Sequence, residues 1–116
     1  PSRRTACVDA EIVALDFETT GLEAGKDRIL SIGLVTIERM AVRLATAEHH
    51  LISCTAPIPE SSAGIHGITD DRAAEGDALR ERLPHLLKAL AGRAILVHHA
   101  AVERQFLEMA CRRLYG

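Results

Sequence analysis

The chain of 116 residues is long enough for one small domain with a single core, and two domains would be hard to fit in it. Aromatic residues make up only 3% of the chain and tryptophan is absent, so the core must come from Leu, Ile, Val and Ala, which suits a sheet covered by helices. The formal net charge of −2 argues against a protein that holds long duplexes through many phosphates, so any contact with nucleic acid should be local or made through metal ions.

Cysteine usage and hydropathy indicate the compartment. Cys7, Cys54 and Cys111 are odd in number and widely spaced, which predicts neither a disulfide framework nor a C-x-x-C metal site. No apolar run approaches the ~20 residues that cross a membrane, and residues 1–10 lack the apolar segment of a signal peptide. We therefore expect a cytoplasmic protein in which residues 1–10 form an N-terminal arm and residues 11–116 form one domain.

The first predicted strand lies in residues 12–21, an apolar run that breaks into two acids, two threonines and a glycine. In an extended backbone successive side chains point to opposite faces, so Asp16 and Glu18 share one face while Leu15 and Phe17 share the other. Two carboxylates roughly 6–7 Å apart along a strand repel each other unless one takes a proton or a cation bridges them. The pattern predicts a site for a hard divalent cation, and the alternative is an ordinary strand end in a polar turn.

The next segments predict a turn and a hairpin. Residues 21–28 are rich in glycine and charge and form the turn, but they are no phosphate-binding loop because Asp27 stands where a Ser or Thr is needed. Residues 29–37 and 42–52 are β-rich, so the chain should turn back on itself near residues 38–40.

Two prolines separate this hairpin from the second half of the chain. Pro57 and Pro59 cannot continue a central strand, so residues 53–63 are predicted to form a loop. Residues 65–71 should make a turn and a short helix that Thr69 or Asp70 caps.

The second half predicts a helix, a strand and a helix. Leucines at helical spacing indicate a helix over residues 77–90, with Asp77 as its N-cap, Gly92 as its stop and a kink or late start at Pro84. Residues 94–97 are wholly apolar and predict a strand covered on both faces. Helical spacing returns over residues 101–114. The order β-β-β-α-β-α predicts an α/β domain with a mixed sheet and helices packed on it.

A third acid, Glu103, follows the short apolar strand near the start of the last helix. If this strand lies parallel to the first, the two strand ends face a common crevice, and Glu103 would complete a carboxylate cluster with Asp16 and Glu18. The alternative is an acid in a first helical turn, where it favours the helix dipole. His99 and Glu103 also have the i,i+4 spacing of a helical metal pair, but a zinc site needs a further ligand of known spacing, which the sequence does not offer.

The string Leu15-Asp16-Phe17-Glu18-Thr19-Thr20-Gly21 resembles the first motif of the DEDD 3′–5′ exonucleases, Asp-x-Glu-Thr-Thr-Gly. This family includes the proofreading subunits of bacterial replicative polymerases, ribonuclease T and oligoribonuclease. Residues 65–69 and 96–103 resemble later parts of the family in the same order. The resemblance implies a ribonuclease-H-like sheet in the order 3-2-1-4-5 with an antiparallel second strand, and the chain contains four of these strands.

The resemblance also implies an activity and a ligand set. The activity is hydrolysis of the phosphodiester bond at the 3′ end of single-stranded nucleic acid, with DNA the expected substrate. The residues that would hold two Mg²⁺ or Mn²⁺ ions for this reaction are Asp16, Glu18 and Glu103. The implied partners are 3′ ends of single-stranded DNA or RNA and a DNA polymerase or fused domain, and no membrane is implied.

Nucleotide contacts are implied by the same two motifs. Thr19, Thr20 and Gly21 would line the 3′-terminal nucleotide, and Ile65 and His66 would lie near its base. For His66 alone, a histidine in a surface turn is an equal alternative.

Two departures from the family keep a second interpretation open. His99, Val102 and Glu103 stand where the second motif usually has Asn, Phe and Asp, which changes the geometry of one metal ligand. Members with a His general base carry a third motif, His followed five residues later by Asp, and the chain ends at Gly116 before such a motif. We expect a piece of a longer protein, with a natural truncation as the alternative. The second functional hypothesis is a degenerate exonuclease fold that binds nucleic acid or a protein partner.

Overall fold

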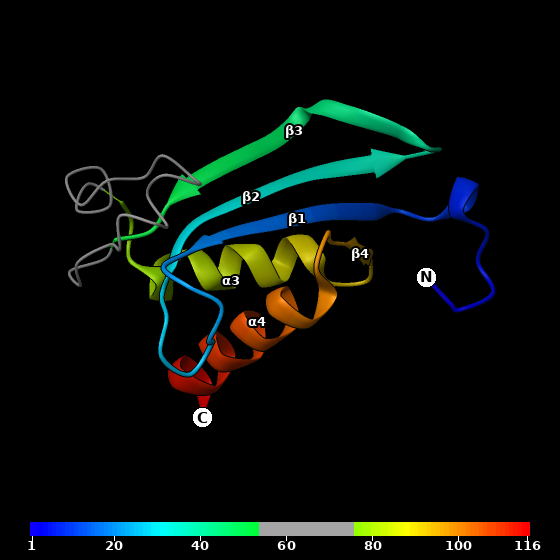
Figure 1. The fold of residues 1–116 in the computed structure, drawn as a ribbon. Helices are drawn as coiled ribbons and strands as arrows, with labels where there is room; N and C mark the ends of the chain where they lie inside the picture. The colour runs from blue at the N-terminus through cyan, green and yellow to red at the C-terminus, as the bar shows by residue number, and fades with distance from the viewer. Residues whose placement is uncertain (54–75) are drawn as a thin grey trace.

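A computed structural model describes residues 1–53 and 76–116 of the chain. Three long strands come first, and a helix, a short strand and a second helix follow (Figure 1). The elements are η1 (Cys7–Asp9), β1 (Ile12–Thr19), β2 (Ile29–Glu38), β3 (Ala41–Leu51), α3 (Leu79–Leu90), β4 (Ala94–Leu96) and α4 (Ala100–Tyr115). The short helix expected at residues 65–71 lies outside the described residues. Within the described ranges, no helix combines the length and the apolar character that crossing a membrane requires.

The strands form one sheet in the order β3-β2-β1-β4. β2 pairs antiparallel with both β1 and β3, whereas β4 pairs parallel with β1, which confirms the predicted mixed sheet. The hairpin turns at Arg39 and Met40, whose φ angles are 51° and 62°. A two-residue turn with a left-handed backbone at both positions matches the twist of the flanking strands. The turn therefore falls where the sequence predicted it, although neither residue is the glycine or asparagine usual there.

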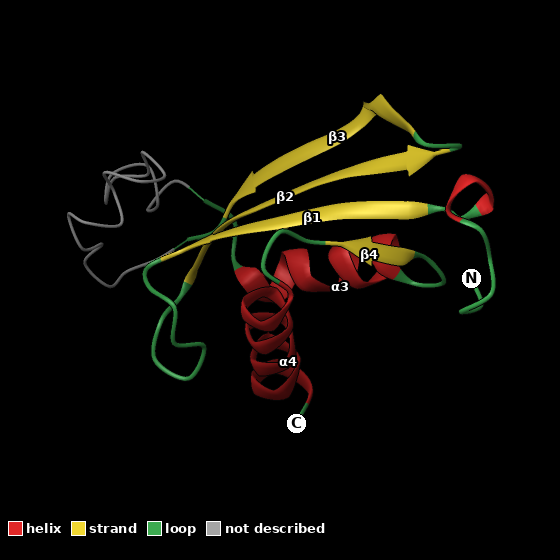
Figure 2. Ribbon diagram, turned by 45° about the vertical axis from the view of Figure 1, so that its right-hand side comes forward, coloured by secondary structure: helices red, strands yellow, loops and turns green. Residues whose placement is uncertain are grey.

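Both helices cover the same face of the sheet (Figure 2). β1 directs Val13, Leu15 and Phe17 to this face, and all three side chains are buried. Burial of such a side chain stabilises the fold by roughly 1.5–3 kcal/mol. The partners that complete this core from β2 and the helices are Ile32, Leu34, Leu83, Leu86, Leu90, Phe106 and Ala110.

Of the kink or late start predicted at Pro84, the late start is wrong, because α3 begins ahead of Pro84 and runs through it, while the kink stays a prediction. Proline lacks the N–H that would bond to the preceding turn, which costs the helix one hydrogen bond. Leu83 and Leu86 on either side of it are almost fully buried, at 1% and 2% exposure. Packing of this apolar face onto the sheet offsets the lost bond.

Asp77 does not cap α3. The N-cap is Ala78, which makes no side-chain capping bond. The Asp77 carboxylate instead accepts hydrogen bonds from Arg82 Nε at 2.9 Å and Nη2 at 2.7 Å. A carboxylate held by two guanidinium donors is satisfied without the helix amides. Gly92 follows the end of the helix with φ of 73°, a conformation that glycine adopts at little cost, and this confirms the predicted stop.

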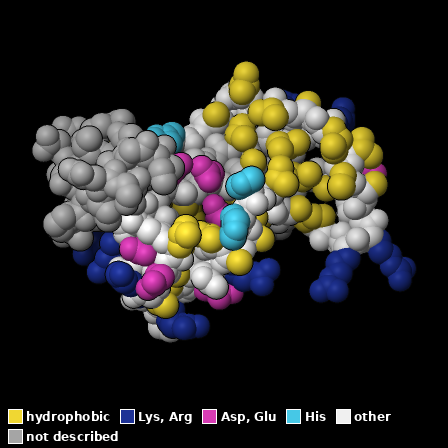
Figure 3. Space-filling model, in the orientation of Figure 1, with side chains coloured by type: hydrophobic (Ala, Val, Ile, Leu, Met, Phe, Trp, Pro, Cys, Tyr) yellow, Lys and Arg dark blue, Asp and Glu magenta, His cyan; other side chains and the backbone are white. Residues whose placement is uncertain are grey.

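The strand predicted to be covered on both faces is exposed instead. Ile95 and Leu96 of β4 keep 45% and 53% of their surface. Among the described residues, β4 pairs with β1 alone and so forms an edge of the sheet. Apolar composition alone predicts burial, whereas the strand order implied by the family resemblance leaves the fourth strand at an edge, as it is among the described residues. Figure 3 shows hydrophobic side chains gathered at the surface over the right-hand part of the molecule.

Candidate functional site

The acids of β1 lie on the sheet face opposite the helices. Leu15 and Phe17 are buried in the core, whereas Asp16 is exposed and Glu18 is partly exposed. Burial alternates along the strand as the sequence predicted, so the two carboxylates share one face. The apolar face of β1 thus anchors the strand in the core, and its opposite face presents two acids near the C-terminal end of the strand.

A loop that follows β1 is held together by the side chains of Thr20 and Asp27. Thr20 Oγ1 donates to Asp27 Oδ1 at 3.1 Å and accepts from the Arg28 amide at 2.9 Å. Asp27 Oδ2 accepts from the Glu23 amide at 2.9 Å. In the sequence, Asp27 served only to exclude a phosphate-binding loop. In the structure, its carboxylate holds the loop together.

Gly21 makes room for that acid. A Cβ at this position would lie 2.5 Å from Asp27 Oδ2 and 2.8 Å from Oδ1, closer than carbon and oxygen tolerate. Thr19 Oγ1 donates to the Gly21 carbonyl at 2.7 Å, which ties the end of β1 to the start of the loop. The Thr-Thr-Gly part of the motif thus has a structural purpose, while its predicted contact with a nucleotide stays a prediction. Ile65 and His66 lie outside the described residues.

Glu103 lies in α4 on the side that packs against the sheet. Its exposed fraction is 7%, and among the described residues its Oε2 atom is buried with no hydrogen-bond partner. A buried acceptor without a partner costs about 1–3 kcal/mol, and more when it is charged. Such an atom calls for an explanation, and a bound ion, a bound water or a catalytic role would each provide one.

Asp16 and Glu103 line adjacent hollows beside the end of β4. Glu103 lines a hollow of about 260 Å³ with Leu15 and Val97. Asp16 lines another, of about 840 Å³, which also includes Leu15, Val97 and His98. Both hollows are thus lined by Leu15 and Val97. The parallel pairing of β1 with β4, on which the predicted common crevice depends, is present, but the two acids line two hollows rather than one, and their joint site stays a prediction.

The three predicted ligands do not form a compact trio. Among the described residues, ligand atoms of three side chains come within 4.8 Å of one another at Glu48, His50 and His85 instead. Ligands of a two-ion site spread more widely than those of one ion, because the ions themselves lie about 3.5–4 Å apart. The buried, unpartnered oxygen of Glu103 and the paired acids of β1 fit the hard cations that prefer oxygen ligands.

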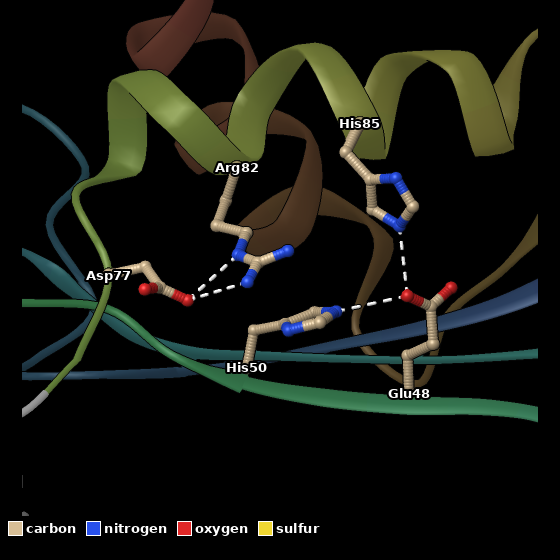
Figure 4. A network of polar contacts seen from close by, with 5 residues as sticks. All are labelled: Glu48, His50, Asp77, Arg82 and His85. Atoms are coloured by element: carbon tan, nitrogen blue, oxygen red, sulfur yellow. Dashed lines mark hydrogen bonds and ion pairs between the residues drawn. The ribbon is translucent and has the colours of Figure 1, made fainter.

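The group at Glu48 was missed in the sequence. Glu48 Oε1 contacts His50 Nε2 at 3.0 Å and His85 Nε2 at 2.8 Å (Figure 4). The hydrogen bond from His50 lowers the pKa of the Glu48 carboxyl most, burial opposes this effect, and the bond from His85 adds to the lowering. The alternation Glu-x-His along a strand was the available signal, but no local pattern links it to His85.

Comparison with known proteins identifies the family. A family model described as exonuclease matches residues 13–115. The chain belongs to this exonuclease family. It is 34% identical over 108 residues to a PolC-type DNA polymerase III of Thermotoga maritima, and this match covers 93% of the chain and 8% of the relative. It is also 34% identical over 96 residues to the epsilon subunit of DNA polymerase III from Treponema pallidum, which covers 81% of the chain and 43% of that subunit.

Solved structures confirm the fold of this exonuclease domain. E. coli exonuclease I in complex with a dT13 oligonucleotide superposes with a TM-score of 0.78 at 12% identity, over 90% of this chain and 24% of that chain. The ribonuclease-H-like α/β architecture inferred from the resemblance is therefore correct. The chain spans less than half the length of these relatives.

Proposed function

We propose that this exonuclease domain hydrolyses the 3′-terminal phosphodiester bond of single-stranded DNA, with Asp16, Glu18 and Glu103 holding two Mg²⁺ or Mn²⁺ ions. The observation that carries the proposal is the buried Oε2 atom of Glu103, which has no partner among the described residues and lies beside the strand that carries the other two acids. A bound metal ion would satisfy this atom.

Each acid would have its own part in this site. Asp16 would contact both ions, Glu18 the ion on the side of the attacking water, and Glu103 the ion on the side of the leaving group. When bound, the ions would supply an activated water and stabilise charge on the leaving oxygen. Asp16 and Glu18 lie on a strand that the core anchors, so their positions would need little adjustment when the substrate binds.

The loop after β1 would receive the 3′-terminal nucleotide. The contacts between Thr20, Asp27 and the backbone fix residues 20–28 relative to the acids. Thr19 and Gly21 lie at the junction of strand and loop, where they would line the sugar and the terminal base. Preorganised contacts of this kind matter because a misplacement of about 1 Å can cost on the order of a hundredfold in rate.

The relatives support a proposal for the substrate class and the partner. The matched proteins include DNA polymerase III of the PolC type and a DNA polymerase III epsilon subunit, and the fold matches an exonuclease I solved with a DNA oligonucleotide. We infer that the domain acts on DNA ends beside a DNA polymerase, as a separate subunit or a fused part, and in the cytoplasm.

A nuclease assay tests the proposal in the protein that carries this domain. A 5′-labelled single-stranded DNA oligonucleotide should give a descending ladder of products with Mg²⁺ or Mn²⁺, and Asp16→Asn should remove it. Glu103→Ala should lower the rate strongly, whereas Glu103→Asp should keep or raise it, because the shorter acid is the usual ligand in this family.

The matched control is Glu108→Ala, which changes an exposed acid on the same helix and should leave the rate unchanged. Full activity of Glu103→Ala at saturating Mn²⁺ would remove Glu103 from the site. Binding of the oligonucleotide without any cleavage, equal in wild type and Asp16→Asn, would favour the binding-module alternative over the enzyme.

A further inference from the structure

A second group of ligand-bearing side chains joins the outer strand β3 to helix α3. Glu48 and His50 come from β3, and His85 comes from α3 (Figure 4). In the sheet, β2 separates β3 from the strand that carries Asp16 and Glu18, so this group is distinct from the proposed exonuclease site.

The three side chains converge on one point. Glu48 Oε1 lies 3.0 Å from His50 Nε2 and 2.8 Å from His85 Nε2, and the two rings meet edge to face at 87° with centroids 5.9 Å apart. Tetrahedral zinc with bonds of about 2.0–2.1 Å separates its ligand atoms by roughly 3.3 Å. The observed contacts need to widen by only about 0.3–0.5 Å to admit such an ion.

Core packing positions all three ligands. Glu48 pairs with Leu34 and His50 with Ile32, so both project to the sheet face where those partners are buried. His85 lies on the helix between two buried leucines, which fix the orientation of α3 against the sheet. A site built on two packed elements holds its geometry better than one on loops.

The donor set selects the metal. Two imidazole nitrogens and one carboxylate oxygen suit Zn²⁺, Co²⁺ or Ni²⁺, whereas Mg²⁺ prefers oxygen ligands alone. The side chains of Glu48, His50 and His85 keep 34%, 19% and 47% of their surface, so an ion can enter and water can take the fourth position.

We propose that Glu48, His50 and His85 bind Zn²⁺ or a similar divalent transition metal ion and thereby clamp β3 to α3. Binding turns each Nε2 from a hydrogen-bond donor into a ligand, so each neutral ring carries its proton on Nδ1 instead. The ion would replace two hydrogen bonds by three coordinate bonds across the interface between sheet and helix.

Titration with Co²⁺ tests this site by visible absorption. The purified protein is stripped with EDTA and then kept in excess Mg²⁺, which occupies sites made of oxygen ligands alone. Wild type should bind one Co²⁺ per chain with the spectrum of a four-coordinate ion containing nitrogen ligands, and Zn²⁺ should displace it. His85→Gln should weaken binding at least about tenfold, since even loss of an outer-shell partner has an effect of that size.

His49→Gln is the matched control, because His49 neighbours His50 but pairs with Gly33 and so projects to the opposite sheet face. It should bind Co²⁺ as wild type does, and so should Asp16→Asn, whose effect is confined to the proposed exonuclease site. Zn²⁺ should raise the thermal midpoint of wild type by several degrees but not that of His85→Gln. The proposal is overturned if wild type binds no Co²⁺ in excess Mg²⁺, or if His85→Gln binds it as tightly as His49→Gln.

Discussion

Replacing Glu103 by Met should stabilise the metal-free protein and abolish its stabilisation by Mn²⁺. Glu103 is 7% exposed, and its Oε2 has no partner among the described residues, a state that costs about 1–3 kcal/mol. Met has a similar length and no polar atom to leave unsatisfied. In EDTA, Glu103→Met should therefore raise the free energy of unfolding by about 1–3 kcal/mol, which for a domain of this size is a rise of at least about 4 °C in thermal midpoint.

Mn²⁺ should offset the difference in stability between wild type and Glu103→Met. At a concentration of one hundred times the dissociation constant, an ion that binds only the folded state stabilises it by about 2.7 kcal/mol. Wild type should gain this amount, while Glu103→Met should gain little because it lacks one ligand. Differential scanning calorimetry in EDTA and in Mn²⁺ measures both effects on the same samples.

The control is Glu108→Met, which makes the same change at an exposed position of α4 and should alter stability by no more than about 0.5 kcal/mol. A lower midpoint for Glu103→Met in EDTA would show that the carboxylate is well satisfied in the folded protein. Equal Mn²⁺ shifts in wild type and Glu103→Met would show that Glu103 is no ligand. Either result refutes the reasoning that joins its burial to metal binding.

Three further predictions concern the loop, the core and the second ligand group. Asp27→Ala should lower the unfolding free energy by about 1–3 kcal/mol in urea denaturation, because Thr20 Oγ1 and the Glu23 amide lose their acceptor; an unchanged value would mean that other contacts hold the loop. Leu83→Ala should lower the unfolding free energy by about 2–5 kcal/mol in the same assay, since the Leu83 side chain is 1% exposed. A loss below about 0.5 kcal/mol, the least that a buried Ile→Val change costs, would contradict the place of Leu83 in the core. The lowered pKa of Glu48 in the folded state means that its contribution is present above the ordinary glutamate pKa of about 4.3 and is lost as pH falls through the lowered value. The difference in thermal midpoint between wild type and Glu48→Gln in EDTA should therefore shrink at acid pH, and a difference independent of pH would argue against the two hydrogen bonds.

Local patterns in the sequence determined the elements and the predicted ligands of the first site. Period-two alternation placed Asp16 and Glu18 on one face of a strand, and helical spacing located α3 and α4, because both periods follow from backbone geometry within one element. The short apolar run after α3 was also found as a strand. The chain order of strands and helices was then enough to predict a mixed sheet with helices packed on it.

Tertiary structure decided what these elements touch. The apolar composition of β4 predicted burial, but its exposure depends on which strand lies beside it, and that is set by the sheet order. Asp77 has the residue type and the position of a helix N-cap. Arg82 nevertheless lies within reach and offers two charged donors, so the Asp77 carboxylate accepts hydrogen bonds from Arg82 instead. Glu48 and His85 are 37 residues apart, and their contact exists only because α3 packs against the face of β3 from which Glu48 projects. The spacing of apolar residues within one strand or helix does not predict a contact between two such elements, because their relative placement is set by how the core packs.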